Sequence, residues 1–328
     1  MVTGLVYDER FLEHDTGAQH PERAQRLTAV VDKLKAACLW NELRRIEFAP
    51  ATVDQLALVH DRSYIQRVED ACRNGGKYLD APDSIICSAS YEVAKLAAGG
   101  VITAARHVVT GQCNNAFCLV RPPGHHAERN RSMGFCLFNN IAIAAEVLLR
   151  EHGLERIAII DFDVHHGNGT QHIFEDRKDV FYISLHEHPA RQYPGTGYSW
   201  EHGKGEGEGF TMNITFDPGA DDTQCHQRVN QMVLPALAKY RPDMILLSAG
   251  FDAAEHDPFG HLNWSAECFM WMTRQFKQAA EEYCDGRLLS VLEGGYHIQS
   301  LAQCVALHVG TLLEPPGHDH LMALKSGL

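Results

Sequence analysis

Short apolar runs alternate with longer amphipathic stretches along nearly the whole chain. The short runs are rich in Ile, Val and Leu and end at polar or glycine-containing segments, which is typical of strands buried on both faces. We expect strands at Gly4–Tyr7, Ala116–Val120, Ile157–Phe162, Val180–Leu185, Phe210–Ile214, Met244–Ser248 and Leu288–Leu292. The amphipathic stretches predict helices at about Arg23–Cys38, Ser90–Val109, Ile141–His152, Gly169–Asp176, Asp222–Tyr240, Ala266–Tyr283 and Ile298–Leu313. This alternation predicts the α/β class, with a central parallel sheet flanked by helices on both faces.

We expect a single domain over residues 1–328. The chain is long enough for one large domain or two ordinary ones, but no linker, repeat or low-complexity tract interrupts the alternation. Hydrophobic residues make up 45% of the chain and charged residues 22%, as in globular proteins. No apolar run approaches the roughly 20 residues that span a bilayer, so we expect no membrane partner.

The net charge and the cysteines narrow the expected partners and the expected location of the protein. The formal net charge of −13 argues against a nucleic-acid partner, because proteins that bind nucleic acids usually carry a basic face. The N-terminus lacks the basic start and long apolar core of a secretory signal. The ten cysteines include no Cys-x-x-Cys pair. We therefore expect free thiols and a cytoplasmic location. The oligomeric state is left open.

The segment Ile157–Gly169 carries the strongest chemical signal in the chain. Its apolar run ends in Asp161, Asp163, His165 and His166, followed by glycines. Because side chains alternate faces along an extended backbone, the first three of these point one way and His166 points the other. A carboxylate and an imidazole two residues apart on one face suit a divalent metal ion. A charged loop capping a strand would explain a lone Asp-x-His, but the whole segment predicts a metal site.

Chemically reactive residues also follow other predicted strands. These segments are Arg121–His126, His186–His188 with Tyr193–Gly197, Ala249–Asp252 and Glu293–Tyr296. Because the carboxyl ends of parallel strands meet at one edge of a sheet, we expect the segments to converge on a catalytic centre. Asp163, His165 and Asp252 would together supply two oxygen ligands and one nitrogen ligand. Three protein ligands leave an open position, as in a catalytic rather than a structural zinc site.

Several motifs agree with one known superfamily in order and spacing. They are Thr3–Asp8, His20–Arg23, Arg121–His126, Gly134–Phe135, Asp161–Thr170, Tyr193–Gly197, Ser248–Asp252 and Glu293–Tyr296. The chain resembles the zinc-dependent histone deacetylase and acetylpolyamine amidohydrolase superfamily over nearly its full length, and it looks closest to the class II branch. The resemblance implies the arginase/deacetylase fold and one catalytic zinc ion bound by Asp163, His165 and Asp252.

The resemblance implies specific roles for a histidine pair and a tyrosine. His126 would be the general base that activates water and then the acid that protonates the leaving amine. His125 would stay largely cationic and stabilise developing charge, and Tyr296 would donate a hydrogen bond to the substrate carbonyl. Asp161 would lie behind His125 and Asn168 behind His126. A carboxylate raises the pKa of its histidine more than a neutral amide does, so the pKa values of the pair would be split. Many relatives have Asp in place of Asn168, but Asn is usual in the class II branch.

The resemblance also implies a substrate tunnel and a second cation. Phe135 and Tyr193 match the aromatic walls of a narrow tunnel for an acyl-lysine stem, although either ring could be ordinary core packing. Gly134 and Phe259 belong to the same predicted substrate-binding set. Arg23 matches a residue of an internal channel for the acid product, with an ion pair at a helix start as the alternative. A monovalent-cation site, usually for potassium, would involve Asp161, Asp163, His165, Ser184 and Leu185.

Two substrates suit the same chemistry. The first is a lysine side chain that carries an acetyl or another acyl group, in a peptide or protein. The second is an acetylated polyamine or another small acylated amine. One polyamine-selective branch of the superfamily carries an acidic gatekeeper at the position of Phe259. An apolar residue there offers no charge to a distant ammonium, so we favour acyl-lysine, although Glu255 lies nearby in the sequence.

Two further classes are less consistent with the residues. A catalytically silent binding module would be expected to have lost Tyr296 or a zinc ligand, and this chain retains all of them. An arginase-like hydrolase would need Asp and His ligands for two manganese ions. Here His125 and His126 are interpreted as acid–base residues instead.

Overall fold

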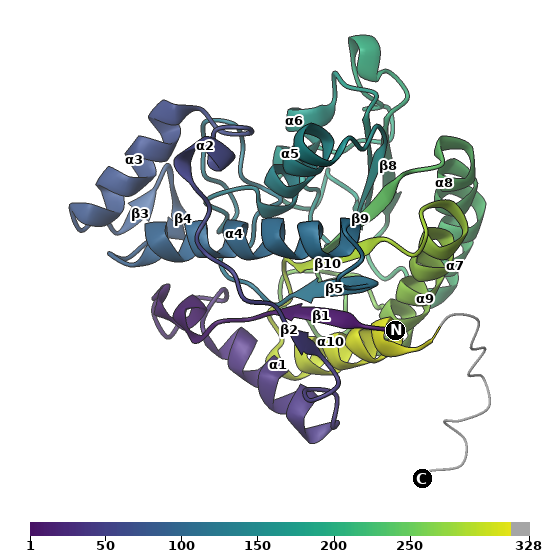
Figure 1. Ribbon diagram of the computed structural model, residues 1–328, viewed down its shortest axis with the longest axis horizontal. Coiled ribbons are helices and arrows are strands. Elements are labelled where there is room, and N and C mark those ends of the chain that lie inside the picture. Colours follow the sequence, from purple (N-terminus) through teal and green to yellow (C-terminus); the bar gives the residue numbers. More distant parts are fainter. Residues whose placement is uncertain (316–328) are drawn as a thin grey trace.

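A parallel sheet of eight strands forms the centre of the molecule. The computed structural model describes residues 1–315 (Figure 1). In spatial order the strands are β2 (Arg44–Arg45), β1 (Thr3–Val6), β5 (Asn115–Cys118), β10 (Leu288–Leu292), β9 (Met244–Ala249), β6 (Ile157–Asp161), β7 (Val180–Glu187) and β8 (Thr211–Phe216). Every neighbouring pair is parallel. Two short antiparallel strands, β3 (Tyr78–Leu79) and β4 (Ala81–Ile85), form a separate sheet.

Helices cover both faces of this sheet. They are α1 (Gln25–Ala36), α2 (Val53–Leu56), α3 (Arg62–Arg73), α4 (Ser90–Val109), α5 (Asn140–His152), α6 (Asn168–Phe174), α7 (Asp222–Arg228), α8 (Leu234–Tyr240), α9 (Ala266–Tyr283) and α10 (Ile298–Leu313). Helices α1, α9 and α10 pack together on one side, and α4 and α5 pack on the other (Figure 1). Short segments η1 (Glu9–Glu13), η2 (Gly205–Gly207) and the π-helical η3 (Val229–Val233) complete the fold. The predicted α/β architecture is confirmed.

The predicted elements differ from the observed ones mainly at their ends. Each predicted strand is present with bounds shifted by a few residues at most. The single helix predicted at Asp222–Tyr240 is a helical run divided into α7, η3 and α8, where the hydrogen-bonding pattern widens to a π-turn. The short elements β2, β3, β4 and α2, and the longer α3, were not predicted. The prediction of one domain for residues 1–328 stays a prediction, and residues 316–328 lie outside the described residues.

The strand register places the end of β6 level with residues of its two neighbouring strands. Asp161, the last residue of β6, is the register partner of Ser184 in β7 and of Ser248 in β9. All five residues of β6 are buried, because the strand lies between β9 and β7 and under helices on both faces. The segments that leave β6, β9, β10 and β5 therefore emerge side by side at the carboxyl edge of the sheet.

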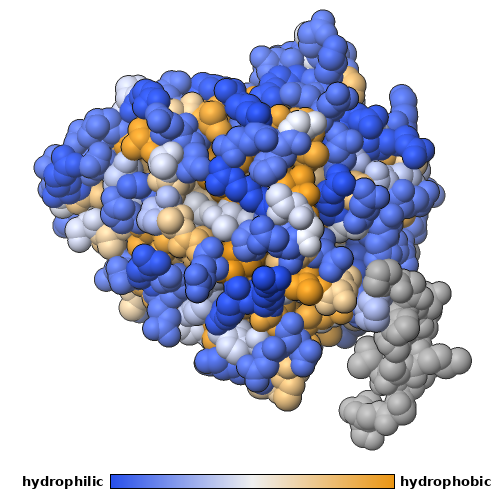
Figure 2. Space-filling model, in the orientation of Figure 1, coloured by the Kyte–Doolittle hydropathy of each residue, from blue (hydrophilic) through white to orange (hydrophobic). Residues whose placement is uncertain are grey.

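The side chains exposed on one face of the molecule can be followed in Figure 2. The face in Figure 2 is largely hydrophilic, with separate hydrophobic patches between polar side chains. None of the helices in residues 1–315 is long and apolar enough to cross a membrane. All ten cysteines fall within this range, and each is a free thiol.

Candidate active site and metal centre

Asp163, His165 and Asp252 form a buried cluster just beyond the carboxyl ends of β6 and β9. Their potential ligand atoms all lie within 4.8 Å of one another, and no other such group of three His, Cys, Asp or Glu side chains occurs within residues 1–315. Nδ1 of His165 is 2.9 Å from Oδ1 of Asp163 and 3.1 Å from Oδ2 of Asp252. The structure thus brings together the three residues that the sequence predicts as metal ligands.

The electrostatics of this cluster fit a divalent cation. Burial, together with the charge of Asp163, raises the pKa of Asp252 to about 7. Burial lowers the pKa of His165, but hydrogen bonds to Asp163 and Asp252 outweigh that effect and raise it to about 10. Two buried carboxylates this close are unfavourable unless a positive charge lies between them. Two oxygens and one nitrogen are a donor set that zinc accepts at catalytic sites, with one position left open.

Two glycines let the backbone approach the cluster closely. The amide of Gly294 donates a hydrogen bond to Oδ2 of Asp163 at 2.8 Å. A Cβ atom at Gly294 would lie 2.1 Å from Oδ2 of Asp252, and one at Gly250 would lie 2.1 Å from Oδ2 of Asp163. Side chains at these two positions would therefore displace the carboxylates.

The two histidines beside the cluster have different partners. Nδ1 of His125 is 3.0 Å from Oδ2 of Asp161, whereas Nδ1 of His126 is 2.7 Å from Oδ1 of Asn168. Burial lowers the pKa of His125, but the charges of Asp161 and Asp163 outweigh it and raise the pKa to about 10. Burial and the charge of His125 hold the pKa of His126 well below its usual value. One imidazole of the pair is thus cationic and the other neutral.

His166 lies apart from this chemistry. Its Nδ1 is 2.8 Å from Oγ1 of Thr196, and its Nε2 is 2.8 Å from Oε1 of Gln171. Both ring nitrogens are therefore used in hydrogen bonds within the protein. This arrangement agrees with a side chain that points away from Asp163 and His165.

Glu293, to which the sequence assigned no role, fixes the backbone that carries the histidine pair. It is fully buried and accepts hydrogen bonds from the backbone amides of Gly124 at 2.7 Å and His125 at 3.1 Å. The hydroxyl of Ser248 donates to its second oxygen at 3.2 Å. Burial raises the pKa of Glu293 to about 7. Its position directly after β10 was the signal that could have marked it.

Tyr296 reaches the same edge of the sheet from the segment after β10. The carboxylate of Asp257 accepts hydrogen bonds from the backbone amides of Tyr296 at 2.6 Å and His297 at 2.9 Å, which fixes this segment. The guanidinium of Arg26 lies 5.0 Å from the centroid of the Tyr296 ring. Burial raises the pKa of Tyr296 well above its usual value, so the phenol keeps its proton and can donate a hydrogen bond.

Aromatic rings lead from the surface towards these residues. Tyr193 and Phe259 are 40% and 38% exposed, and their rings lie 5.1 Å from His126 and 5.0 Å from Tyr296. Phe135 packs edge-on against Tyr296 at 5.8 Å. The backbone of Gly134, with φ at +51°, passes so close to His126 that a Cβ there would lie 2.3 Å from the ring. The four residues predicted to bind substrate therefore border the histidine pair and Tyr296.

The remaining predicted residues lie in β7 and just before α1. Ser184 and Leu185 are buried in β7, and Ser184 is the register partner of Asp161. Arg23 is half-buried, and its guanidinium donates to the carbonyl of Ala18 at 2.7 Å. Arg23 forms no ion pair with a carboxylate in the part of the chain that the structure describes. Its predicted channel role stays a prediction.

Two other arginines, to which the sequence assigned no role, are fully buried. Arg121 forms hydrogen bonds with both carboxylate oxygens of Glu22, at 2.6 and 2.8 Å. Arg26 binds the same carboxylate at 3.1 Å and also donates to the carbonyls of Gly295 and Glu293. This buried ion cluster ties the start of α1 to the segment that carries Tyr296.

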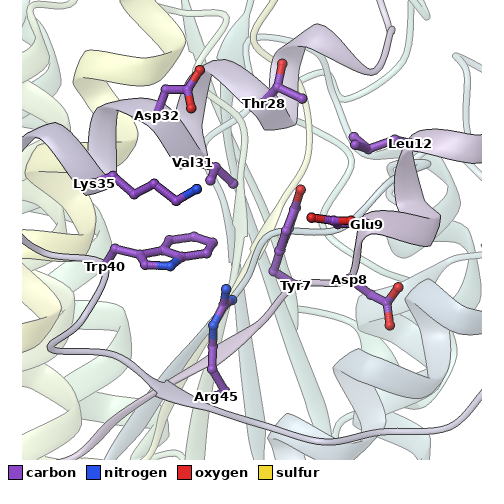
Figure 3. Close-up of a pocket in the computed structure, with 10 residues that line it drawn as sticks. All are labelled: Tyr7, Asp8, Glu9, Leu12, Thr28, Val31, Asp32, Lys35, Trp40 and Arg45. Atoms are coloured by element: carbon purple, nitrogen blue, oxygen red, sulfur yellow. The ribbon is translucent and has the colours of Figure 1, made fainter.

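A separate hollow of about 550 Å³ opens beside α1, beyond the end of β1 (Figure 3). The guanidinium of Arg45 lies 3.8 Å from the centroid of Trp40, and Nζ of Lys35 lies 5.4 Å from it. Arg45 and Lys35 thus place their positive charges against the ring of Trp40. Glu9 and Asp32 add negative charge to the walls of the hollow. None of the candidate catalytic residues lines this hollow.

Comparisons with known proteins place the chain in a family. Residues 20–312 match the histone deacetylase domain. The chain is 41% identical to a "Probable deacetylase" of Archaeoglobus fulgidus, over 91% of this chain and 82% of that protein. It is 40% identical to the histone deacetylase-like amidohydrolase of Pseudomonas aeruginosa, over 85% and 72%. It is 38% identical to the human polyamine deacetylase HDAC10, over 96% and 49%.

A solved structure leads to the same family. The HDA15 HD domain superposes with a TM-score of 0.90 at 37% identity, covering 95% of this chain and 89% of that one. The chain is therefore a hydrolase of the deacetylase class. The chain belongs to the histone deacetylase family.

Proposed function

We propose that this protein removes acetyl or other acyl groups from the side-chain nitrogen of lysine, using one zinc ion. The observation that carries the proposal is the buried cluster of Asp163, His165 and Asp252 beside one neutral and one cationic histidine. Asp163, His165 and Asp252 would hold the zinc ion. Bound zinc lowers the pKa of a water molecule to about 7 and polarises a carbonyl group.

His126 has the protonation state that a general base needs. It is neutral, and its Nδ1 faces the amide oxygen of Asn168, so Nδ1 carries the proton and Nε2 has the free lone pair. Nε2 accepts a proton from the attacking water and then delivers it to the departing lysine nitrogen as the amide C–N bond breaks. The products are a carboxylic acid and an amine, which ionise to a carboxylate and an ammonium group.

His125 and Tyr296 stabilise the charge that develops on the substrate. Asp161 keeps His125 protonated, so a cation stands beside the reacting carbonyl throughout the reaction. Tyr296 retains its phenolic proton and donates a hydrogen bond to the carbonyl oxygen as negative charge accumulates there. Donors that are fixed before the reaction need no reorganisation during it.

The aromatic residues that border the site would favour acyl-lysine over acetylated polyamines. Phe259 stands at the exposed end of the aromatic wall and offers no negative charge to a distant ammonium group. The similarity to a protein named polyamine deacetylase keeps the second substrate class open to test. We expect higher kcat/KM for an acetyl-lysine peptide than for acetylspermidine, with both activities lost on chelation. A clear preference for acetylspermidine would favour the alternative.

A second, monovalent cation is part of the proposal. It would lie beneath the active site, where Asp161, Asp163 and His165 leave β6 and Ser184 and Leu185 lie in β7. Potassium is the expected ion. Activity should then depend on potassium concentration when sodium replaces potassium at constant ionic strength.

A further inference from the structure

The orientation of the Asn168 amide decides which nitrogen of His126 carries the proton. An Asn side chain can present either its oxygen or its NH2 group to a partner. When Oδ1 faces Nδ1 of His126, that nitrogen must be the donor, and Nε2 is free to accept a proton. If the amide were reversed, its NH2 group would face Nδ1, which would then be the acceptor. The proton of a neutral imidazole would move to Nε2, and the base would be lost.

Glu128 specifies one of these orientations. Its Oε1 lies 2.5 Å from Nδ2 of Asn168, and the Glu128 side chain is only 17% exposed. An ionised carboxylate is purely an acceptor, so a reversed amide would place two oxygens in contact. The backbone carbonyl of His126 also accepts from Nδ2, but at the longer distance of 3.3 Å. Glu128 is therefore the strongest constraint on the amide.

A second contact holds Glu128 itself in place. Nδ1 of His172 lies 2.8 Å from the same Oε1 atom. Asn168 and His172 are four residues apart in α6, so both project from one face of the helix towards Glu128. The hydrogen bond to Glu128 raises the pKa of His172. The carboxylate is thus anchored by two groups from a single helix.

We propose that Glu128 is a positioning residue that fixes the amide of Asn168 and thereby keeps the proton of neutral His126 on Nδ1. Glu128 has no direct contact with the metal cluster in this arrangement, and it acts through Asn168 alone. The inference rests on the proposed role of His126 as the base. In addition to the base, the inference requires a hydrogen-bond acceptor at position 128.

Two variants separate the acceptor from the charge. Glu128→Gln keeps an acceptor oxygen, so we expect kcat within about threefold of wild type. Glu128→Leu has similar size but no acceptor, so we expect kcat to fall about tenfold, the loss expected of one charged hydrogen bond, with KM nearly unchanged. Glu206→Leu is the matched control, because Glu206 is 81% exposed and, within residues 1–315, pairs only with Lys178. Equal losses in the Gln and Leu variants would overturn the proposal.

A rescue experiment tests the direction of the hydrogen bond. Asn168→Asp alone places two carboxylates against each other and should lower kcat. Adding Glu128→Gln supplies an NH2 group to the new carboxylate, so the double variant should recover most of that loss. Nitrogen-15 spectra of the histidines provide a readout apart from activity. The His126 signal, identified by its absence in His126→Ala, should show a protonated Nδ1 in wild type and a mixture of tautomers in Glu128→Leu.

A double-mutant cycle completes the test. If Glu128 acts only through Asn168, then Glu128→Leu should lower kcat no further in an Asn168→Ala background. The proposal would be overturned if the two losses in kcat multiplied in the Glu128→Leu/Asn168→Ala protein. It would also be overturned if kcat did not recover in the Asn168→Asp/Glu128→Gln protein. If His126→Ala retains activity, the proposed function itself fails. If His126→Ala is inactive while Glu128→Leu matches wild type in kcat and in its nitrogen-15 spectrum, only the role of Glu128 fails.

Discussion

The backbone amide of Gly294 donates a hydrogen bond to the Oδ2 atom of Asp163 at 2.8 Å, which places the main chain directly against a candidate metal ligand. The same glycine faces Asp252, since an added Cβ would lie 2.1 Å from its Oδ2 atom. The geometry of the carboxylate pair therefore depends on the absence of a side chain at position 294.

Gly294→Ala should lower metal affinity because one of the two carboxylates must move. We expect a loss of at least about tenfold in zinc affinity, which corresponds to about 1.4 kcal/mol. Competition with a chromogenic chelator measures this quantity directly. Gly310→Ala in α10 is the control, because among residues 1–315 outside α10 itself the only atom within 4 Å of the added Cβ is a methyl group of Leu39, at 3.9 Å. Equal zinc affinity in the two variants would contradict the argument.

Tyr296→Phe should reduce kcat while leaving zinc content intact. The phenol of Tyr296 is held protonated and is the proposed hydrogen-bond donor to the substrate carbonyl. Loss of one such donor lowers kcat by about 10²–10³-fold. Steady-state kinetics with an acetyl-lysine peptide, together with metal analysis, measures both quantities. Tyr78→Phe, at an exposed tyrosine, should behave as wild type.

The fold was predictable because its signals are local. The apolar strand Ile157–Asp161, followed directly by Asp163 and His165, shows both burial and metal chemistry within one short segment. Helix α3 also has a signal, since buried Tyr64, Ile65 and Val68 lie on one face, but its many charged residues obscure it. The hairpin of β3 and β4 contains Pro82 and Asp83, which are rare in strands.

The supporting residues of the site were not predictable in the same way. Glu128 is an ordinary acidic residue in the sequence, and Glu293 is marked there only by its place directly after a strand. They acquire their importance from partners that are distant in the chain, such as Asn168 and Ser248. Glu22 is similar, because its two arginine partners lie on different segments. Hydrogen bonds of this kind leave no periodic pattern in the sequence.

Glu22 should make the free energy of unfolding depend on pH. Burial raises the pKa of Glu22, but the charges of Arg121 and Arg26 outweigh it and lower the pKa from 4.5 to about 2. A carboxyl group with a depressed pKa in the folded state stabilises that state above pH 4.5, and this contribution is lost as pH falls towards 2. The shift corresponds to on the order of 3 kcal/mol.

Comparison with Glu22→Gln isolates this contribution. The variant leaves two buried arginines without their carboxylate, so it should be less stable by about 3–5 kcal/mol near neutral pH. The difference in free energy of unfolding between the two proteins should shrink as pH falls from about 5 to about 3. Urea denaturation at several pH values measures it. A difference that stays constant over that range would contradict the assignment.

Phe259→Glu should shift substrate preference towards polyamines. The new carboxylate would stand at the exposed end of the aromatic wall, next to Tyr296. We expect the ratio of kcat/KM for acetylspermidine over an acetyl-lysine peptide to rise about tenfold, or about 1.4 kcal/mol. Phe259→Gln has similar size without the charge and should leave the ratio nearly unchanged. A rise of equal size in both variants would show that charge is not the cause.

The metal content and the activity of wild type and His165→Ala decide whether one zinc ion carries the reaction. We predict one zinc ion per wild-type chain, with deacetylation lost on chelation and restored by one equivalent of zinc. His165→Ala should bind little zinc and show no deacetylation, whereas His202→Ala, at an exposed histidine, should match wild type. Two metal ions per chain, or deacetylation by the metal-free protein, would contradict the account.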